Sequence, residues 1–180
     1  MLTVDFFPRI HTAIAEWMAC MTFILPQSKR FGGKDPRQFA LYGLFLLLQS
    51  FICQWMDGVT SNGLWMLLML AAMLSMFLMI QTTCRLRPAE ACYIWAHAFL
   101  AAEFTASMAW QMNYYLLAGN NVSTFGTWIV MAAVYALDFG VIYALNRHIS
   151  IFQWRQTITL KELISVMITA VAAFALSNLS

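Results

Sequence analysis

Charged residues are scarce in this chain. Only 10% of its 180 residues are Asp, Glu, Lys or Arg, whereas 62% are hydrophobic; an ordinary soluble domain has about 25% charged residues. The formal net charge of +2 is small, and the basic residues are divided among short loops, so no basic patch is available for nucleic acid. The composition therefore predicts an integral membrane protein whose main partner is the lipid bilayer.

Motifs for catalysis and metal binding are missing as well. The sequence contains no GxSxG, no P-loop and no other glycine-rich phosphate cradle. The four cysteines have no CxxC spacing and lie in or beside apolar segments, which is typical of small buried hydrophobic residues. His97 and His148 belong to no HxxxH or HExxH pair, so we expect no metal site and no cofactor within these residues.

A signal peptide is also lacking, because neither a basic n-region nor a small-residue cleavage pattern precedes the first basic loop. We therefore expect the first apolar segment to remain in the mature chain. A spanning helix needs about 20 mostly apolar residues, and turn-forming or basic loops separate the segments that qualify. The sequence predicts an all-α, polytopic membrane helix bundle, a single domain with about six transmembrane helices, at 6–25, 38–56, 64–83, 91–117, 127–145 and 162–179.

The first of these segments, 6–25, has the weakest apolar character. It contains Pro8, Arg9, His11 and Glu16, so two readings stay open: a spanning helix, or an amphipathic helix that lies in the membrane interface. Pro26 follows directly and is expected to end the helix.

The basic residues predict the orientation of the chain. All Lys and Arg residues except Arg9 lie in the loops 26–37, 84–90 and 146–161, which alternate along the sequence. Because cytoplasmic loops carry an excess of Lys and Arg, these three loops should be cytoplasmic. The N-terminus and Ser180 should then be extracellular in a multi-pass protein of the cell membrane.

A polar stripe runs through the segment 91–117. Ser107, Trp110, Gln111 and Tyr114 fall on the helical face of Glu103, at offsets of four, seven, eight and eleven residues. A charge near the bilayer centre costs about 2.5–3.5 kcal/mol, so the stripe should face other helices or a water-filled cavity. Its aromatic residues form either an aromatic belt or the lining of an outward pocket for a peptide or an amphiphile.

Glu103 itself has two interpretations. It is either a structural carboxylate hydrogen-bonded to neighbours such as Gln49 or Tyr143, or a group that couples ligand or proton binding to helix movement. Asp138, in the segment 127–145, and Glu16 share these interpretations, with less weight on the functional one. We take Glu103, its stripe and Asp138 as the candidate ligand-binding or coupling residues, with no catalytic residue among them.

Methionines recur along the segment 64–83. Met66, Met69, Met73 and Met76 are spaced three or four residues apart, and thioethers suit Cu(I), so a copper path is one reading. Packing is favoured instead, because methionine is a common gap filler and no Cys or His is paired with this row at helical spacing.

Two stretches carry a resemblance to a known family. They are EFTASMAWQMNYYL at 103–116 and LKELISVMITAVAAFALSNLS at 160–180. They resemble segments of the multi-pass sensor regions of bacterial histidine kinases whose ATP-binding part is of the GHKL type, related to accessory-gene-regulator receptors. The shared features are a Glu-Phe-small-small-Ser run before Trp-Gln and aromatics, and a Lys-Glu-Leu start that closes on Ser-Asn-Leu-Ser.

The resemblance implies that this chain is the N-terminal sensing module of a two-component sensor histidine kinase, dimeric in the full-length protein. It would relay an extracellular or membrane-partitioned signal, a peptide in some members, by repacking its helices. Another spanning helix and a kinase domain that uses ATP and Mg²⁺ would follow Ser180. The phosphoacceptor His box and the Asn box are absent from these residues, so signal transduction here would involve no catalysis.

Other functions stay open. A small secondary transporter or channel subunit would use the intramembrane carboxylates Glu103 and Asp138 to carry protons or cations, although the sequence shows no clear inverted repeat or discontinuous helix. A membrane-embedded enzyme is disfavoured by the missing ligand clusters, and a structural scaffold is a further alternative.

Overall fold

The computed structural model describes residues 10–28, 36–56, 59–84, 86–117, 124–148 and 158–179. These residues form helices joined by short connections, and this part of the chain contains no strand. The helices are α1 (Ile10–Ser28), α2 (Pro36–Met56), α3 (Asn62–Cys84), α4 (Pro88–Leu117), α5 (Thr124–His148) and α6 (Leu160–Leu179).

The predicted all-α helix bundle is confirmed, and each helix lies within a few residues of its predicted range. Residues 6–9 of the first predicted segment lie outside the described residues. Three helices, α2, α3 and α5, contain stretches long and apolar enough to cross a membrane, whereas the apolar part of α1, Ile10–Pro26, is shorter. The protein is therefore membrane-embedded, as its composition predicts.

Local sequence signals start two of the helices. At α6, the backbone N–H of Thr159 donates to the Glu162 carboxylate at 3.0 Å, and the Glu162 N–H donates back to the Thr159 hydroxyl at 3.4 Å. This reciprocal pair is a capping box. At α4, Pro88 occupies the first helical position, where its missing N–H costs nothing, and the Arg87 N–H donates to the Glu90 carboxylate at 3.2 Å.

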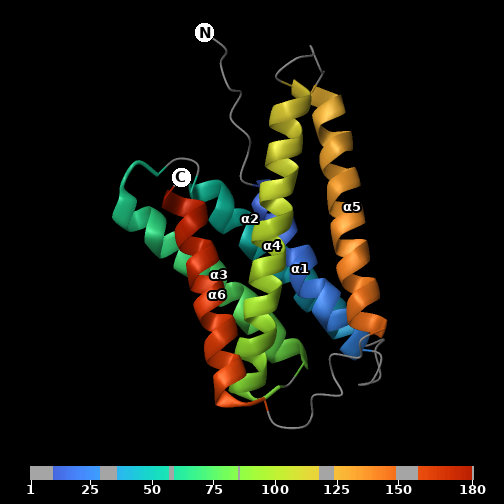
Figure 1. The fold of residues 1–180 in the computed structure, drawn as a ribbon, viewed down its shortest axis with the longest axis vertical. Coiled ribbons are helices and arrows are strands. Elements are labelled where there is room, and N and C mark those ends of the chain that lie inside the picture. The colour runs from blue at the N-terminus through green and yellow to red at the C-terminus, as the bar shows by residue number, and fades with distance from the viewer. Residues whose placement is uncertain are drawn as a thin grey trace.

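Successive helices run in alternating directions, so α1 begins and α6 ends at the same end of the bundle (Figure 1). Helix α1 packs against α2, α3, α4 and α5, most extensively against α4. Helix α4 likewise packs against four helices: α1, α3, α5 and, on its other side, α6. The segment that the sequence left open between a spanning and an interfacial helix is thus, with α4, a central helix of the bundle.

Small residues explain how α1 fits at the centre. Ala13, Ala15, Ala19 and Cys20 are all fully buried, and such residues let helix backbones approach one another closely. Ala15, Ala19 and Cys20, together with Phe23, belong to the main core cluster, which also includes side chains from α2 to α6. The interior of the bundle therefore forms around the small face of α1.

Pro26 lies inside α1 and does not end it, so this expectation was wrong. Proline has no N–H to donate to the carbonyl four residues earlier, that of Thr22. The Asn146 side-chain amide of α5 lies 3.5 Å from this carbonyl and donates a long hydrogen bond to it. A neighbouring helix thus supplies the missing donor, which is how proline is tolerated in membrane helices, and α1 continues to Ser28.

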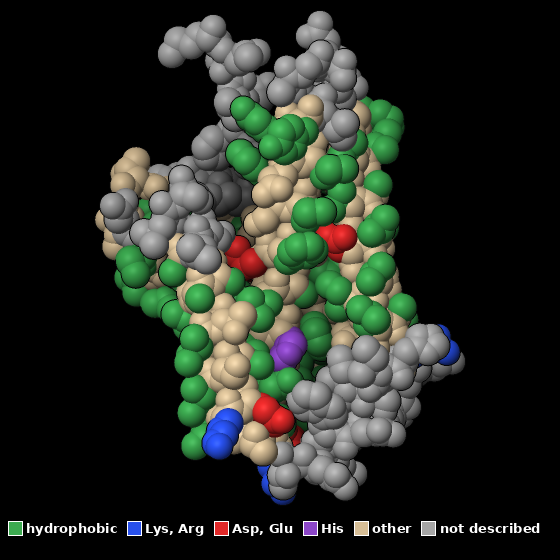
Figure 2. All heavy atoms as spheres, in the orientation of Figure 1, with side chains coloured by type: hydrophobic (Ala, Val, Ile, Leu, Met, Phe, Trp, Pro, Cys, Tyr) green, Lys and Arg blue, Asp and Glu red, His purple; other side chains and the backbone are tan. Residues whose placement is uncertain are grey.

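The charged residues separate along the bundle. The described basic residues lie at the ends of helices: Arg37, Arg87, Arg147 and Lys161. Because the helices alternate in direction, all four positions fall at the end opposite the start of α1. Figure 2 shows blue basic side chains only toward that lower end of the visible face, with acidic side chains also at mid-height.

Candidate functional site

Buried polar side chains from three helices form a chain of hydrogen bonds at the bundle centre. The side-chain amide nitrogen of Gln49 in α2 donates to the Glu16 carboxylate of α1, and the Ser75 hydroxyl of α3 donates to the Gln49 carbonyl oxygen. All three residues are at most 5% exposed. Each bond crosses between helices, so this chain of bonds ties α1, α2 and α3 together.

Glu103 adds α4 to this arrangement. The Glu103 charge acts electrostatically on the Glu16 carboxyl group. Two carboxylates that repel each other away from bulk water cannot both stay ionised without cost, so the interaction favours protonation of one of them. Within the bundle, the pair and its amide and hydroxyl partners can therefore hold or release a proton.

Asp138 of α5 lies at about the same height. The Tyr135 hydroxyl donates to the His11 carbonyl oxygen at 2.9 Å, which fixes α5 beside α1. Glu16 lies about 7.5 Å beyond His11 along α1, and Asp138 lies about 4.5 Å beyond Tyr135 along α5, at a rise of 1.5 Å per residue. Because the two helices run in the same direction, the two carboxyl groups lie at similar heights. We call Glu16, Gln49, Ser75, Glu103 and Asp138 the polar layer, since it brings polar groups from α1 to α5 to one level.

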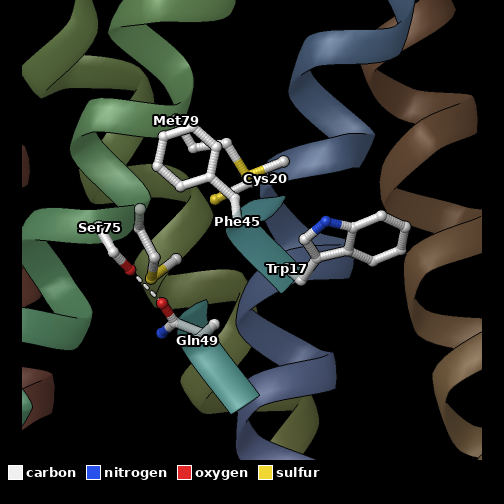
Figure 3. Close-up of a pocket in the computed structure, with 7 residues that line it drawn as sticks. Trp17, Cys20, Phe45, Gln49, Ser75 and Met79 are labelled. Atoms are coloured by element: carbon white, nitrogen blue, oxygen red, sulfur yellow. Dashed lines mark hydrogen bonds between the residues drawn. The ribbon is translucent and has the colours of Figure 1, made fainter. Parts of the chain in front are cut away.

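A small cavity adjoins the polar layer, with room for about one water molecule. Its lining comes from α1, α2 and α3: Trp17, Cys20, Phe45, Gln49, Ser75, Met76 and Met79. Figure 3 shows Ser75 and Gln49 facing each other on one side, with Cys20, Met79 and the Phe45 ring on the other. The cavity therefore has a polar wall and a sulfur-rich, apolar wall.

Several buried polar atoms have no hydrogen-bond partner among the described residues. They are the hydroxyl groups of Tyr42, Thr83 and Thr105, the Asn113 side-chain nitrogen and one Asp138 carboxylate oxygen. Thr105 is fully buried and Asn113 is 3% exposed. Such atoms are costly in an apolar interior, and they are distributed over α2 to α5.

The predicted stripe on α4 divides into two parts. Glu103 is partly buried and reaches the polar layer, but the other members, Ser107, Trp110, Gln111 and Tyr114, are all exposed on the single chain. The expectation that the whole stripe faces other helices or a cavity was therefore wrong within this chain. The helix exposes Trp110 and Tyr114 as a stacked pair with ring centroids 5.7 Å apart.

Sequence reasoning left three members of the polar layer out of the candidate site: Glu16, Gln49 and Ser75. Gln49 was expected beside Glu103, whereas the structure bonds it to Glu16. One signal could have found Glu16. Glu16 lies among the small residues Ala13, Ala15 and Ala19, and small residues around a carboxylate indicate a helix packed inside the bundle.

The described residues contain no group of three or more His, Cys, Asp or Glu side chains that could hold a metal ion. His97 instead places its Nδ1 2.9 Å from the Tyr93 carbonyl oxygen in the same helix.

No protein-family model matches the chain, and no similar protein was found among the curated sequences or the solved structures. The functional argument therefore depends on the geometry of the site.

Proposed function

We propose that this chain is the membrane-embedded sensing module of a two-component sensor histidine kinase. In this proposal it relays an extracellular or membrane-partitioned signal, such as a peptide or an amphiphile, by changing the packing of its helices. The resemblance of 103–116 and 160–180 to GHKL-type sensor regions supports the family. The kinase domain, with its ATP and Mg²⁺, would belong to a part of the protein beyond these residues.

One observation carries the proposal: a central helix is also the helix that holds the charged centre of the polar layer. Glu16 on α1 is linked by hydrogen bonds to α2 and α3 and interacts electrostatically with Glu103 on α4. A change in the charge of this pair therefore acts on four helices together. A fixed scaffold has no need of two neighbouring carboxyl groups at its centre, because they destabilise it.

The mechanism is a population shift between two packings of the bundle. When one of the two carboxyl groups is protonated, the repulsion between Glu16 and Glu103 is removed and α1 stays packed against α4. With both carboxylates ionised they repel, and α4 moves relative to α1. A signal needs only to favour one of these states, and each 1.4 kcal/mol of differential binding changes their ratio about tenfold.

The same proposal assigns an orientation and a place for the signal. The basic end of the bundle faces the cytoplasm, which places the aromatic end of α4, with Trp110 and Tyr114, toward the extracellular side. These exposed rings and the Gln111 amide offer a contact surface for an amphiphilic ligand, and a homodimer of the full-length protein would bring two such surfaces together.

The test is Glu103→Gln, which keeps the shape of the side chain and removes its charge. Spin labels on the exposed positions Leu47 of α2, which Gln49 ties to α1, and Met112 of α4 report helix separation in lipid nanodiscs. In the wild-type chain we expect two distance populations whose ratio changes with pH. In Glu103→Gln we expect a single population that does not respond to pH, with the helix content unchanged.

The control is Ser107→Ala, an uncharged change at an exposed position of the same helix. Ser107→Ala should keep both populations. A single distance population in the wild type at every pH would overturn the switching mechanism. Sequencing the gene beyond the Ser180 codon tests the kinase assignment separately: an immediate stop codon would remove it.

The pair of carboxyl groups also favours a second function, a proton-coupled transporter. The two proposals differ in one measurable property. The isolated chain in sealed liposomes with a pH-sensitive dye inside should carry no protons across the membrane if it is a sensor. A proton flux that Glu16→Gln abolishes would favour the transporter.

A further inference from the structure

The sulfur-rich wall of the small cavity suggests a second site, independent of the proposed sensing role. Cys20 from α1 and Met76 and Met79 from α3 are among the residues that line the cavity. Their side chains are at most 2% exposed, so water does not compete for the sulfur atoms from outside. Figure 3 shows Cys20 and Met79 close together on the side of the cavity opposite Gln49 and Ser75.

The cavity bears on the interpretation of the α3 methionines as packing residues, which depended in part on the lack of a cysteine or histidine partner. The methionine row of α3 has no cysteine or histidine at helical spacing within its own helix, but the fold brings Cys20 to it from α1. A second thiol, Cys84, lies near enough for its charge to act on the Cys20 thiol. The sulfur cluster therefore extends toward the basic end of the bundle.

We infer that Cys20, Met76 and Met79 form a binding site for a monovalent soft metal ion, Cu(I). Thiolate and thioether ligands select Cu(I) over harder ions, and the three sulfur-bearing side chains line one cavity with room for a single water-sized particle. The methionines also fill space, but the cavity beside them shows that they do not fill all of it.

Charge balance favours a monovalent ion. One thiolate neutralises one Cu(I), and the thioethers are uncharged, so the occupied site carries no net charge in an apolar interior. A divalent ion with the same ligands would leave one buried positive charge. On binding, the S–H bond of Cys20 breaks, a Cu–S bond forms, and the proton is released to the surrounding water.

The experiment is a competition titration of the purified chain in detergent, anaerobic and reduced, with Cu(I) bound to a chromophoric chelator. We expect the wild-type chain to withdraw one equivalent. Cys20→Ala should abolish this, and Met79→Leu, which conserves volume and removes the thioether, should weaken it by about 10- to 100-fold, a range known even for residues that support a metal ligand indirectly.

Two matched variants serve as controls. Cys92→Ala removes a cysteine that does not line the cavity, and Met66→Leu makes the same change at an exposed position of α3. Both should bind like the wild type. X-ray absorption of the copper complex should show only sulfur in the first shell.

Equal affinity of wild type and Met79→Leu, no binding at all, or a nitrogen and oxygen shell would each overturn the site. If Cys20→Ala does not fold, Met79→Leu and Met76→Leu still decide the question. Loss of Cu(I) binding in these variants with unchanged spin-label distances would separate this site from the proposed sensing mechanism.

Discussion

Helices α1 and α3 rank in opposite order by apolar character and by burial in the bundle. Helix α3 is among the three helices apolar enough to cross a membrane, yet only 33% of the residues in its apolar stretch are buried. Helix α1 contains His11, Glu16 and Pro26 and is too short to qualify, yet it lies at the centre of the bundle. The more polar of the two helices is the interior one.

The difference shows which property marks the inside of this protein. Lipid is as apolar as leucine, so a hydrophobic helix gains little by leaving it. Polar groups gain much, because lipid offers them no hydrogen-bond partner. Helix α1 combines polar groups with small residues that permit close contact, whereas α3 exposes Leu67, Leu70 and Leu74. In this bundle, apolarity indicates contact with lipid.

The largest expected effect comes from the same substitution on both helices. Ala15→Leu adds bulk at a fully buried position of α1, and overpacking of this kind costs about 1–3 kcal/mol. Ala71→Leu adds the same bulk at an exposed position of α3 and should leave stability nearly unchanged. The free energy of unfolding in detergent, measured by titration with a denaturing detergent, compares the two.

If Ala71→Leu destabilised the chain as much as Ala15→Leu, the contrast between the central and the peripheral helix would be lost.

A smaller effect is expected from Gln49→Leu, which leaves the buried Glu16 and Ser75 without their shared partner. Unsatisfied buried groups cost about 1–3 kcal/mol, although hydrogen bonds between membrane helices average only about 0.6 kcal/mol. We therefore expect a loss of about 1–2 kcal/mol in the unfolding free energy. Gln54→Leu, at an exposed position of the same helix, should be neutral.

The double variant Glu16→Leu with Gln49→Leu should lose less than the sum of the two single variants, because each single change already breaks the same bond. Strict additivity would show that the bond does not contribute to stability.

The smallest effect concerns Pro26. Asn146→Leu removes the donor to the Thr22 carbonyl, and a long bond of 3.5 Å should contribute about 0.6 kcal/mol, the average for membrane helices. In a Pro26→Ala background the residue 26 N–H can satisfy that carbonyl itself, so Asn146→Leu should cost less there. A double-mutant cycle of unfolding free energies measures the difference.

An equal cost of Asn146→Leu in both backgrounds would mean that Asn146 stabilises the bundle for another reason than the proline.

The candidate site was predictable only in part. Glu103 was found because a carboxylate in an apolar segment is conspicuous, and in the structure its charge acts on Glu16. Periodicity assigned Ser107 and Gln111 to the helical face of Glu103. A face about 100° wide can include both residues that contact a neighbouring helix and residues on the surface, and these two are exposed. Gln49 and Ser75 are single polar residues in long apolar helices, and only contacts with Glu16 distinguish them.

Composition and periodicity by themselves determined that this protein is a membrane-embedded bundle of helices, because apolar length and turn signals act locally along the chain. The basic residues determined which helix ends lie together. Only the tertiary structure decided that α1 is central, that Pro26 is tolerated, and that Glu16, rather than Glu103 alone, organises the polar layer. These outcomes depend on which helices share a hydrogen bond or a small-residue contact, and such pairings link residues far apart in sequence.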